Sequence, residues 1–331
     1  VVASAARLLA AFGPWADARA QVPADAVPPD TVVPVAPLVV RAARPEMEAG
    51  ASVVAVATDS LWTVPAPTLE TALRALPLVR VRANSRGEAQ PSLRGSEERQ
   101  LAVLVDGVPL TLGWDHRTDL SIVPATAVRE LRIVRGLSSV LAGPNVLAGS
   151  VEMDVAAGEA PGSDRPLAFQ AALDAAGGGA LGAEAGVRLG AAPGSVRARL
   201  GFAYRDRPGV PAPDGLDAAD GLRENSDLRH GEGYLVLRGG RDGGARWGAW
   251  ASATAAERGV PPELHVSEPR LWRYPDQRRA LVVLSAGTGT LATPWGRVEL
   301  RAAAGADAAH TEIASYATRA YDTVAEREVG R

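Results

Sequence analysis

Strict alternation of apolar and polar positions fills the second half of the chain. Along Arg297–Ala308, one face carries Val298, Leu300 and alternate alanines, and the other carries arginine, glutamate and aspartate. A period of two is the pattern of a half-buried β-strand. It predicts seven strands, over Leu167–Asp174, Ala183–Gly190, Ser195–Arg205, Leu228–Gly240, Arg246–Glu257, Gln277–Thr288 and Arg297–Ala308.

The connections between these strands distinguish a soluble sheet from a membrane barrel. Short connections alternate with long polar ones, and the long ones are Arg207–Asp227, Arg258–Asp276 and the residues after Ser315. A soluble sheet has no need of this order, whereas membrane barrels alternate short turns with long loops. Several of the strands reach the ~9–11 residues that cross a bilayer at a tilt. We therefore predict antiparallel all-β transmembrane barrel strands, and about seven strands make an incomplete barrel.

The first half of the chain has short elements separated by glycine and proline. Thr68–Leu76 has leucines at helical spacing behind a threonine that is a candidate N-cap. Val103–Val105 and Val108–Leu110 are apolar runs on either side of Asp106-Gly107, a pair that suits a type I′ hairpin turn. By itself Asp106 reads as a turn residue only. The elements predict a small α+β domain.

Two Arg-Gly pairs flank that hairpin. Arg94-Gly95 and Arg135-Gly136 each follow a short apolar run. Taken alone, each arginine reads as a solvated residue at a strand end and each glycine as a stop with positive φ. Between them, Pro124–Val134 is predicted to be a short helix that turns into a strand.

Together the motifs SLRG, VLVDGVPL and VRELRIVRGLSSVLAGPNVLAGS closely resemble the plug domain of TonB-dependent outer-membrane receptors. The resemblance is specific over about Thr68–Val155 and looser over Arg258–Arg279. It implies an α+β plug followed by a barrel, and it implies that Arg94 and Arg135 pair with acidic residues on the barrel wall. We call residues 46–155 the plug region. A linker at 156–165 and the first part of the barrel at 166–331 complete the predicted organisation.

The N-terminus resembles the remnant of a secretory signal peptide over residues 1–20. Arg7 precedes the apolar stretch Leu8–Trp15, and Ala18-Arg19-Ala20 supplies an A-x-A cleavage site. The alternative is an apolar helix of a cytosolic protein. Residues 21–45 are proline-rich and are predicted to be an extended periplasmic segment.

That extension contains strand-forming residues with no obvious local partner. Such a segment can be captured by β-augmentation, in which backbone hydrogen bonds supply affinity. The resemblance implies a TonB box that pairs with the energy-transducing protein TonB. Our first candidate consists of Asp30, Thr31, Val32, Val33 and Val35, and the second is Leu38–Ala42. A plain proline-rich tether is the alternative.

Aromatic and polar residues in two predicted loops are candidates for facing the substrate. Trp114, Asp115 and His116 lie in WDHRTD, which is otherwise a plain polar loop. Trp272 and Tyr274 lie in the second segment of resemblance, where surface packing of aromatics is the alternative.

Composition narrows the function further. The net charge of −3 gives no electrostatic case for nucleic acid, and the absence of cysteine excludes disulfides and thiolate metal sites. Four scattered histidines and no nucleophile–base pair predict neither a metal site nor an enzyme, and no cofactor is expected.

The predicted function is TonB-dependent import of a scarce extracellular substrate across the bacterial outer membrane. The resemblance favours a ferric siderophore or another metal chelate, with TonB and outer-membrane lipids as the other partners. A passive porin or an adhesin-type barrel without TonB coupling is the alternative.

Overall fold

A computed structural model describes most of the chain after residue 45. It covers residues 46–48, 51–58, 68–110, 119–136, 146–155, 167–173, 177–190, 195–241 apart from 217 and 219, and 244–330. The chain divides into Val1–Arg41 and Ala42–Arg331, and the described residues all belong to the second unit. No helix in these ranges is long and apolar enough to cross a membrane.

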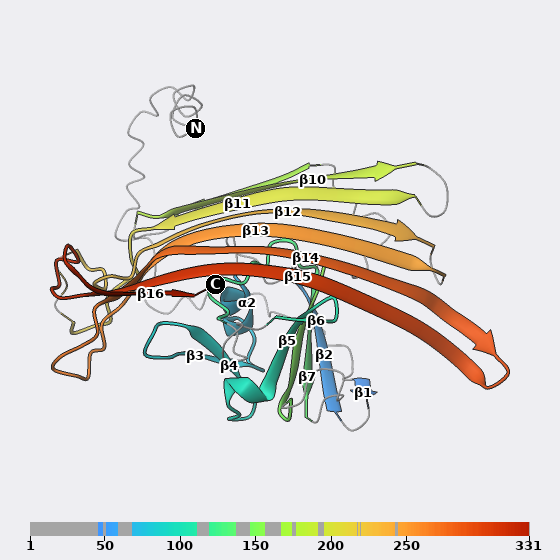
Figure 1. Ribbon diagram of the computed structural model, residues 1–331, viewed down its shortest axis with the longest axis horizontal. Coiled ribbons are helices and arrows are strands. Elements are labelled where there is room, and N and C mark those ends of the chain that lie inside the picture. The colour runs from blue at the N-terminus through green and yellow to red at the C-terminus, as the bar shows by residue number, and fades with distance from the viewer. Residues whose placement is uncertain are drawn as a thin grey trace, which may run out of the picture. The chain divides into compact units, whose positions relative to one another are not determined.

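A six-stranded sheet forms the centre of the plug region, in the order β1-β2-β7-β8-β5-β6. Its strands are β1 (Glu46–Glu48), β2 (Ala51–Ala57), β5 (Leu101–Val105), β6 (Val108–Pro109), β7 (Glu130–Arg135) and β8 (Gly149–Asp154). Strands β5 and β8 run parallel, and the other neighbours are antiparallel. The β1–β2 pair therefore joins the rest of the sheet through β7 alone (Figure 1).

The predicted hairpin joins β5 to β6. Asp106 has a φ of 45° and Gly107 a φ of 86°, which confirms the prediction that both central residues have positive φ. Asp106 also has a second role, because its Oδ1 accepts a hydrogen bond of 3.0 Å from the backbone N–H of Val155. The turn is thereby tied to the residue that follows β8.

The predicted helix is α2 (Leu69–Arg74), and Thr68 is its N-cap as expected. Leu69 and Leu73 are fully buried. The helix lies beside a separate hairpin of β3 (Arg80–Ala83) and β4 (Ala89–Ser92), which is followed by the 3₁₀ turn η3 (Glu98–Gln100). These elements enclose the plug core, since the leucines pack with apolar residues of β5, β7 and β8.

The prediction of a helix at the start of Pro124–Val134 is wrong. The backbone N–H of Val128 donates to the carbonyl of Ala125 in a turn, and β7 begins at Glu130. Leu131 and Ile133 alternate as fully buried residues, which is strand spacing. The strand predicted at the end of this segment is therefore confirmed as β7. The residues before it are not helical because the backbone groups of Val128 and Arg129 bond instead to Thr58 and Asp154.

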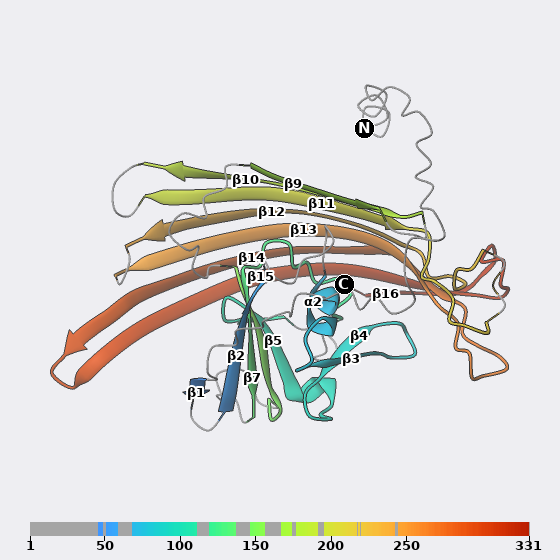
Figure 2. The same ribbon diagram turned by 180° about the vertical axis from the view of Figure 1, so that it is seen from behind.

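The second half of the chain forms an eight-stranded antiparallel sheet in chain order, which we call the wall sheet (Figures 1 and 2). Each strand is hydrogen-bonded to the next, so the sheet has the meander order that barrels require. Its strands are β9 (Leu167–Leu173), β10 (Gly179–Leu189), β11 (Val196–Arg207), β12 (Leu228–Gly240), β13 (Arg246–Val260), β14 (Trp272–Thr293), β15 (Gly296–Tyr316) and β16 (Val324–Gly330).

All seven predicted strands are confirmed, but the structure adds an eighth, β16. The sequence predicts a long loop after Ser315, whereas the chain turns within seven residues, 317–323, and pairs again with β15. Glu326, Arg327 and Glu328 place charges on both faces of β16, so the strand lacks the apolar alternation that identifies its neighbours.

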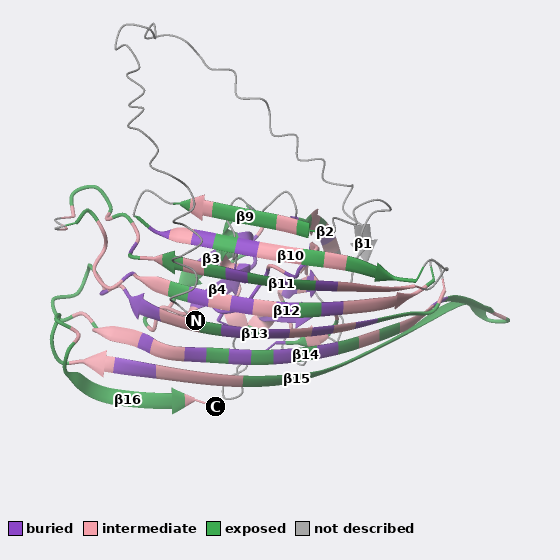
Figure 3. Ribbon diagram, turned by 90° about the horizontal axis from the view of Figure 1, so that it is seen from above, coloured by how far each residue is buried: buried purple, intermediate pink, exposed green. Residues whose placement is uncertain are grey.

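The two faces of the wall sheet differ in their partners. Inward residues such as Tyr234, Trp250 and Val283 are buried and belong to the same apolar cluster as the plug core. Outward residues such as Leu200 and Leu284 are 61% and 54% exposed. Figure 3 shows the resulting alternation of buried and exposed positions along the strands. An apolar outer face of this kind is expected of a lipid-facing sheet.

Candidate functional site

The interface between the wall sheet and the plug region is built around Arg258 on β13. Its Nη2 donates to Asp119 Oδ2 at 2.9 Å, and the two side chains are only 9% and 3% exposed. Its Nη1 donates to the carbonyl of Gly87 at 2.6 Å and its Nε to Gln277 at 3.0 Å. The guanidinium also lies 4.2 Å from the ring centroid of Tyr274. One wall arginine therefore holds two separate segments of the plug region.

The plug side of this contact is preorganised. Asp119 Oδ1 accepts hydrogen bonds from the backbone N–H groups of Ala89 and Ser121 and from the Ser121 hydroxyl. Gly87 has a φ of +74°, and a Cβ there would approach a methyl of Val260 to 2.9 Å. Glycine at this turn therefore allows the close approach of the plug backbone to β13.

Glu88 neighbours the same contact. It accepts a hydrogen bond of 2.6 Å from Asn84 Nδ2. Burial, together with the like charge of Asp119, raises the pKa of Glu88 above its ordinary value. Because a raised carboxyl pKa means that the charged form is disfavoured in the fold, Glu88 weakens this part of the interface near neutral pH.

A second contact is centred on Glu184 of β10. Arg129, just before β7, donates to Glu184 Oε1 at 2.5 Å, and Tyr234 of β12 donates its hydroxyl to Oε2. Arg199 of β11 lies 3.8 Å from the same carboxylate. Gly201 makes room for this arrangement, because a Cβ there would lie 2.5 Å from the Tyr234 ring. This carboxylate therefore joins three wall strands to the plug region.

Wall side chains also bind the plug backbone directly. Arg199 Nη2 donates to the carbonyl of Ala127 at 2.7 Å, and Arg238 Nη2 donates to that of Val155 at 2.6 Å. The Tyr274 hydroxyl donates to the carbonyl of Arg86 at 3.0 Å. Hydrogen bonds from a charged donor are about twice as strong as neutral ones, so the arginines are the main anchors.

A crevice of about 440 Å³ lies between α2 and the ends of β11, β12 and β13. Its lining includes four arginines and two carboxylates, and also the ring of His230, which is 1% exposed. The residues that line it are Thr68, Glu70, Thr71, Arg74, Gly87, Ser121, Arg205, Arg207, Val210, Ser226, Asp227, Leu228, His230, Arg258, Gly259 and Pro261.

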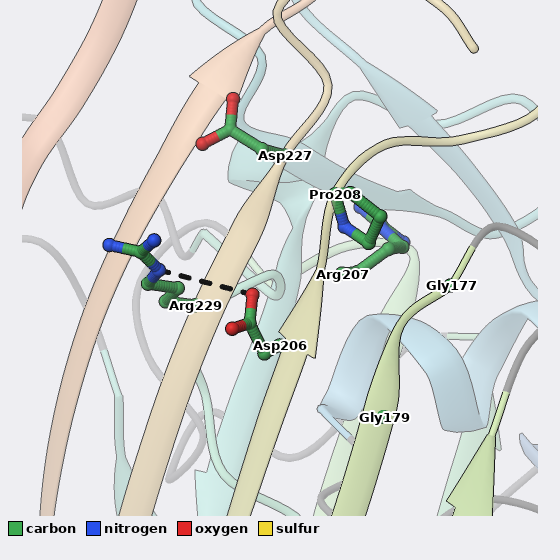
Figure 4. Close-up of a pocket in the computed structure, with 7 residues that line it drawn as sticks. All are labelled: Gly177, Gly179, Asp206, Arg207, Pro208, Asp227 and Arg229. Carbon is green, nitrogen blue, oxygen red and sulfur yellow. Dashed lines mark ion pairs between the residues drawn. The ribbon is translucent and has the colours of Figure 1, made fainter. Parts of the chain in front are cut away.

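A second hollow, of about 360 Å³, lies at the rim of β10, β11 and β12 (Figure 4). Arg207 and Asp227 line both cavities. In this hollow Arg229 faces Asp206 at 3.9 Å, and both side chains are more than half exposed. An exposed pair of this kind contributes little stability, so the hollow has no strong electrostatic feature of its own.

The Arg-Gly pairs lie at strand ends, as their local pattern indicates. Gly95 and Gly136 both have positive φ, and Arg94 itself has a φ of 52°. Arg94 is exposed, and Arg135 Nε donates to Ser52 Oγ at 3.1 Å within the plug region. Within the described ranges neither arginine forms an ion pair with the wall sheet, so the pairing of Arg94 and Arg135 with wall carboxylates stays a prediction.

The structure describes only two of the residues predicted to face the substrate, Trp272 and Tyr274. Tyr274 is 2% exposed and covered by the plug region, while Trp272 is half-buried with Arg86 5.5 Å from its ring centroid. Both therefore pack against the plug region here. Residues Trp114, Asp115 and His116 lie outside the described residues, and so do the TonB-box candidates Asp30, Thr31, Val32, Val33 and Val35 and the second segment, Leu38–Ala42.

The interface residues Arg258, Glu184 and Arg199 were not among the sequence-predicted site residues. A partial signal for them exists, because each is a charged residue at an inward position of an alternating strand. Such a residue needs a partner across the interface. The sequence does not show which partner, since two of the acceptors are backbone carbonyls.

Residues 45–150 match the family described as the TonB-dependent Receptor Plug Domain. The heme/hemopexin utilization protein C of Haemophilus influenzae (strain 86-028NP) is 34% identical over 96 residues, which are 29% of this chain and 13% of that protein. The chain thus matches a small part of the length of this curated relative.

Two solved structures share the fold over most of the chain. The copper transporter OprC has a TM-score of 0.57 at 16% identity, over 79% of this chain and 38% of its own. The FrpB iron transporter from Neisseria meningitidis has a TM-score of 0.57 at 14% identity, over 82% and 42%. The family match covers the plug region, and the fold shared with the two solved structures covers both the plug region and the wall sheet. Residues 45–150 therefore form a plug domain of the TonB-dependent receptor family, and the chain as a whole shares the fold of these two transporters.

Proposed function

We propose that this protein imports a scarce extracellular substrate, a ferric siderophore or another metal chelate, in a process energised by TonB. The observation that carries the proposal is a plug region attached to the wall sheet by a small number of charged contacts, centred on Arg258 and Glu184. Such contacts fix a closed position and can be exchanged when the plug moves.

The relatives support a metal-containing substrate. Their names refer to heme utilization, copper transport and iron transport. The family consists of transporters and receptors, and a plug acts by occupying a pore and moving. A passive porin or adhesin is less well supported, because it has no use for residues 45–150 as a plug.

TonB coupling is proposed to act through the extension before the plug. Asp30–Val35 is the first candidate for the strand that TonB captures, and Leu38–Ala42 is the second. A captured strand would transmit force first to β1, which lies at the edge of the plug sheet, and through it to β2. Edge strands have one neighbour fewer to release than central ones.

The test deletes residues 30–42 in the full-length receptor and measures uptake of ⁵⁵Fe chelates by iron-limited cells. We expect energised uptake to be lost while surface binding is retained. Deletion of residues 21–29 is the matched control, since it shortens the same proline-rich extension but spares both candidate strands. Unchanged uptake without residues 30–42 would reject the TonB segment, and equal uptake in cells without TonB would reject active import.

A further inference from the structure

The crevice between α2 and the wall sheet has the features of a ligand site. Its volume of about 440 Å³ lies within the range of ~300–1,000 Å³ that small-molecule sites occupy. It lies where β11 ends at Arg207, β12 begins at Leu228 and β13 ends at Val260. The long connections 208–227 and 261–271 start from these strand ends. Long loops of such barrels are extracellular, so the crevice is at the side from which substrate arrives.

One cation in this crevice has no partner. Arg205 faces inward from β11 and is half-buried, and in the described part of the chain its guanidinium makes no hydrogen bond or ion pair. Its register partner on β12 is His230. A half-buried guanidinium without a carboxylate is costly, because part of its hydration is lost without compensation.

His230 is the second incomplete group. The side chain is 1% exposed and lines the crevice, yet neither Nδ1 nor Nε2 has a hydrogen-bond partner among the described residues. A buried polar group left without a partner costs about 1–3 kcal/mol. A ligand oxygen that accepts a hydrogen bond from the ring would remove that cost.

The carboxylates that line the crevice are already occupied. Glu70 pairs with Arg74 at 2.9 Å. Asp227 pairs with Arg273, which approaches both of its oxygens at 2.8 and 2.6 Å. The lining residue Arg258 is in turn paired with Asp119. The charge left without compensation is therefore the positive charge of Arg205, with Arg207 close by on the same strand face.

We propose that this crevice binds the anionic oxygens of the imported substrate, and hence that the substrate is a chelate carrying carboxylate groups. The inference rests on the proposed import function and adds a substrate class to it. Arg205 supplies the forked pair of N–H donors that matches a carboxylate, and His230 supplies a further N–H. A neutral ligand would leave the Arg205 charge without compensation.

The test compares two iron chelates on the purified full-length receptor in detergent at 0.15 M salt. Ferric citrate carries carboxylates, and a neutral ferric trihydroxamate of similar size does not. Titration calorimetry should show tighter binding of ferric citrate. Arg205→Gln should weaken citrate binding by at least ~10-fold, the effect of losing one charge-assisted contact, and should change trihydroxamate binding less than ~2-fold. His230→Leu should act in the same direction, and His230→Gln should retain part of the affinity.

Arg229→Gln is the matched control, because Arg229 is next to His230 on β12 but 63% exposed and outside this crevice. It should leave both affinities unchanged. Equal binding of ferric citrate by Arg205→Gln and the parent protein would overturn the site. Preferred binding and TonB-dependent uptake of the trihydroxamate would overturn the substrate class and uphold import. Binding of citrate without TonB-dependent uptake of any chelate would support the site and refute the import function.

Discussion

Replacing Arg258 by methionine removes the guanidinium that joins β13 to the plug domain while keeping a side chain of similar length. Four contacts are lost together: the ion pair with Asp119, the hydrogen bonds to the Gly87 carbonyl and to Gln277, and the stacking on Tyr274. Asp119 then stays buried at 3% exposure without its counter-charge. The variant therefore tests whether this arginine fixes the plug in place.

The free-energy cost of Arg258→Met depends on the hydrogen bonds that Asp119 keeps in the variant. Removal of one partner of a buried ion pair costs ~3–5 kcal/mol, because the remaining charge is uncompensated. Asp119 keeps three donors on Oδ1, from Ala89 and Ser121, so the lower end of that range applies. We expect about 3 kcal/mol, which corresponds to roughly a hundredfold more frequent opening of the contact.

Hydrogen exchange of the full-length receptor in detergent measures this opening. Amides of residues 84–92 and 119–121 should lose about a hundredfold in protection, while those of β5 in the plug core should not change. Arg246→Met is the matched control on the same strand, because Arg246 pairs with Glu299 but is 53% exposed. Exposed pairs contribute up to ~1 kcal/mol, so less than about a fivefold change is expected there.

The double variant Arg258→Met with Asp119→Asn separates charge from packing. It should recover part of the lost protection, because the buried carboxylate is no longer charged. Arg258 does not fix the plug if Arg258→Met leaves protection over residues 84–92 within twofold of the parent protein, or if Arg246→Met has the same effect as Arg258→Met.

Two further predictions concern the plug domain itself. Gly149→Ala should destabilise it by at least ~2 kcal/mol, since Gly149 has a φ of +138° and a Cβ would lie 1.9 Å from the Val134 carbonyl oxygen. Gly95→Ala, at a φ of +81° with open space around it, should cost only ~1–2 kcal/mol, so equal losses in thermal unfolding would contradict the clash. Glu88→Gln should stabilise the plug near neutral pH, because the raised pKa of Glu88 means that its charged form opposes folding. That gain should disappear in acid, once the carboxyl is protonated in both the folded and unfolded states, and a gain that persists there would exclude the electrostatic cause.

Local patterns predicted most of the fold. Alternation identified the wall strands because apolar residues recur on their outward face, while several of their inward residues pack on the plug, so a period of two runs along the strand. The Asp106-Gly107 turn and the Thr68 cap were predicted because each depends on a few neighbouring residues. The β16 strand was missed because its charges lie on both faces and its pairing with β15 is made by the backbone.

The candidate site was much less predictable. Arg258 and Asp119 are 139 residues apart, and nothing local in either segment specifies the other. The unsatisfied state of His230 is likewise a property of the assembled interface, since it depends on which groups of α2 and β11 come near the ring. Sequence motifs located the plug region, but the contacts that attach it to the wall depend on the register of both sheets.

Many of the hydrogen bonds that attach the plug to the wall are accepted by backbone carbonyl oxygens of the plug. Wall side chains donate hydrogen bonds to the backbone carbonyls of Arg86, Gly87, Ala127 and Val155. A substitution that keeps the local backbone conformation leaves such a carbonyl in place. Plug sequences can therefore drift at Arg86, Ala127 and Val155 without a compensating change in the wall, whereas Gly87 is held by its positive φ and its close approach to Val260. Co-variation between plug and wall should therefore be weak at these contacts. A plug transplanted from a related receptor should fit this wall if its turns keep the same backbone path and it retains the charges of Asp119 and Arg129.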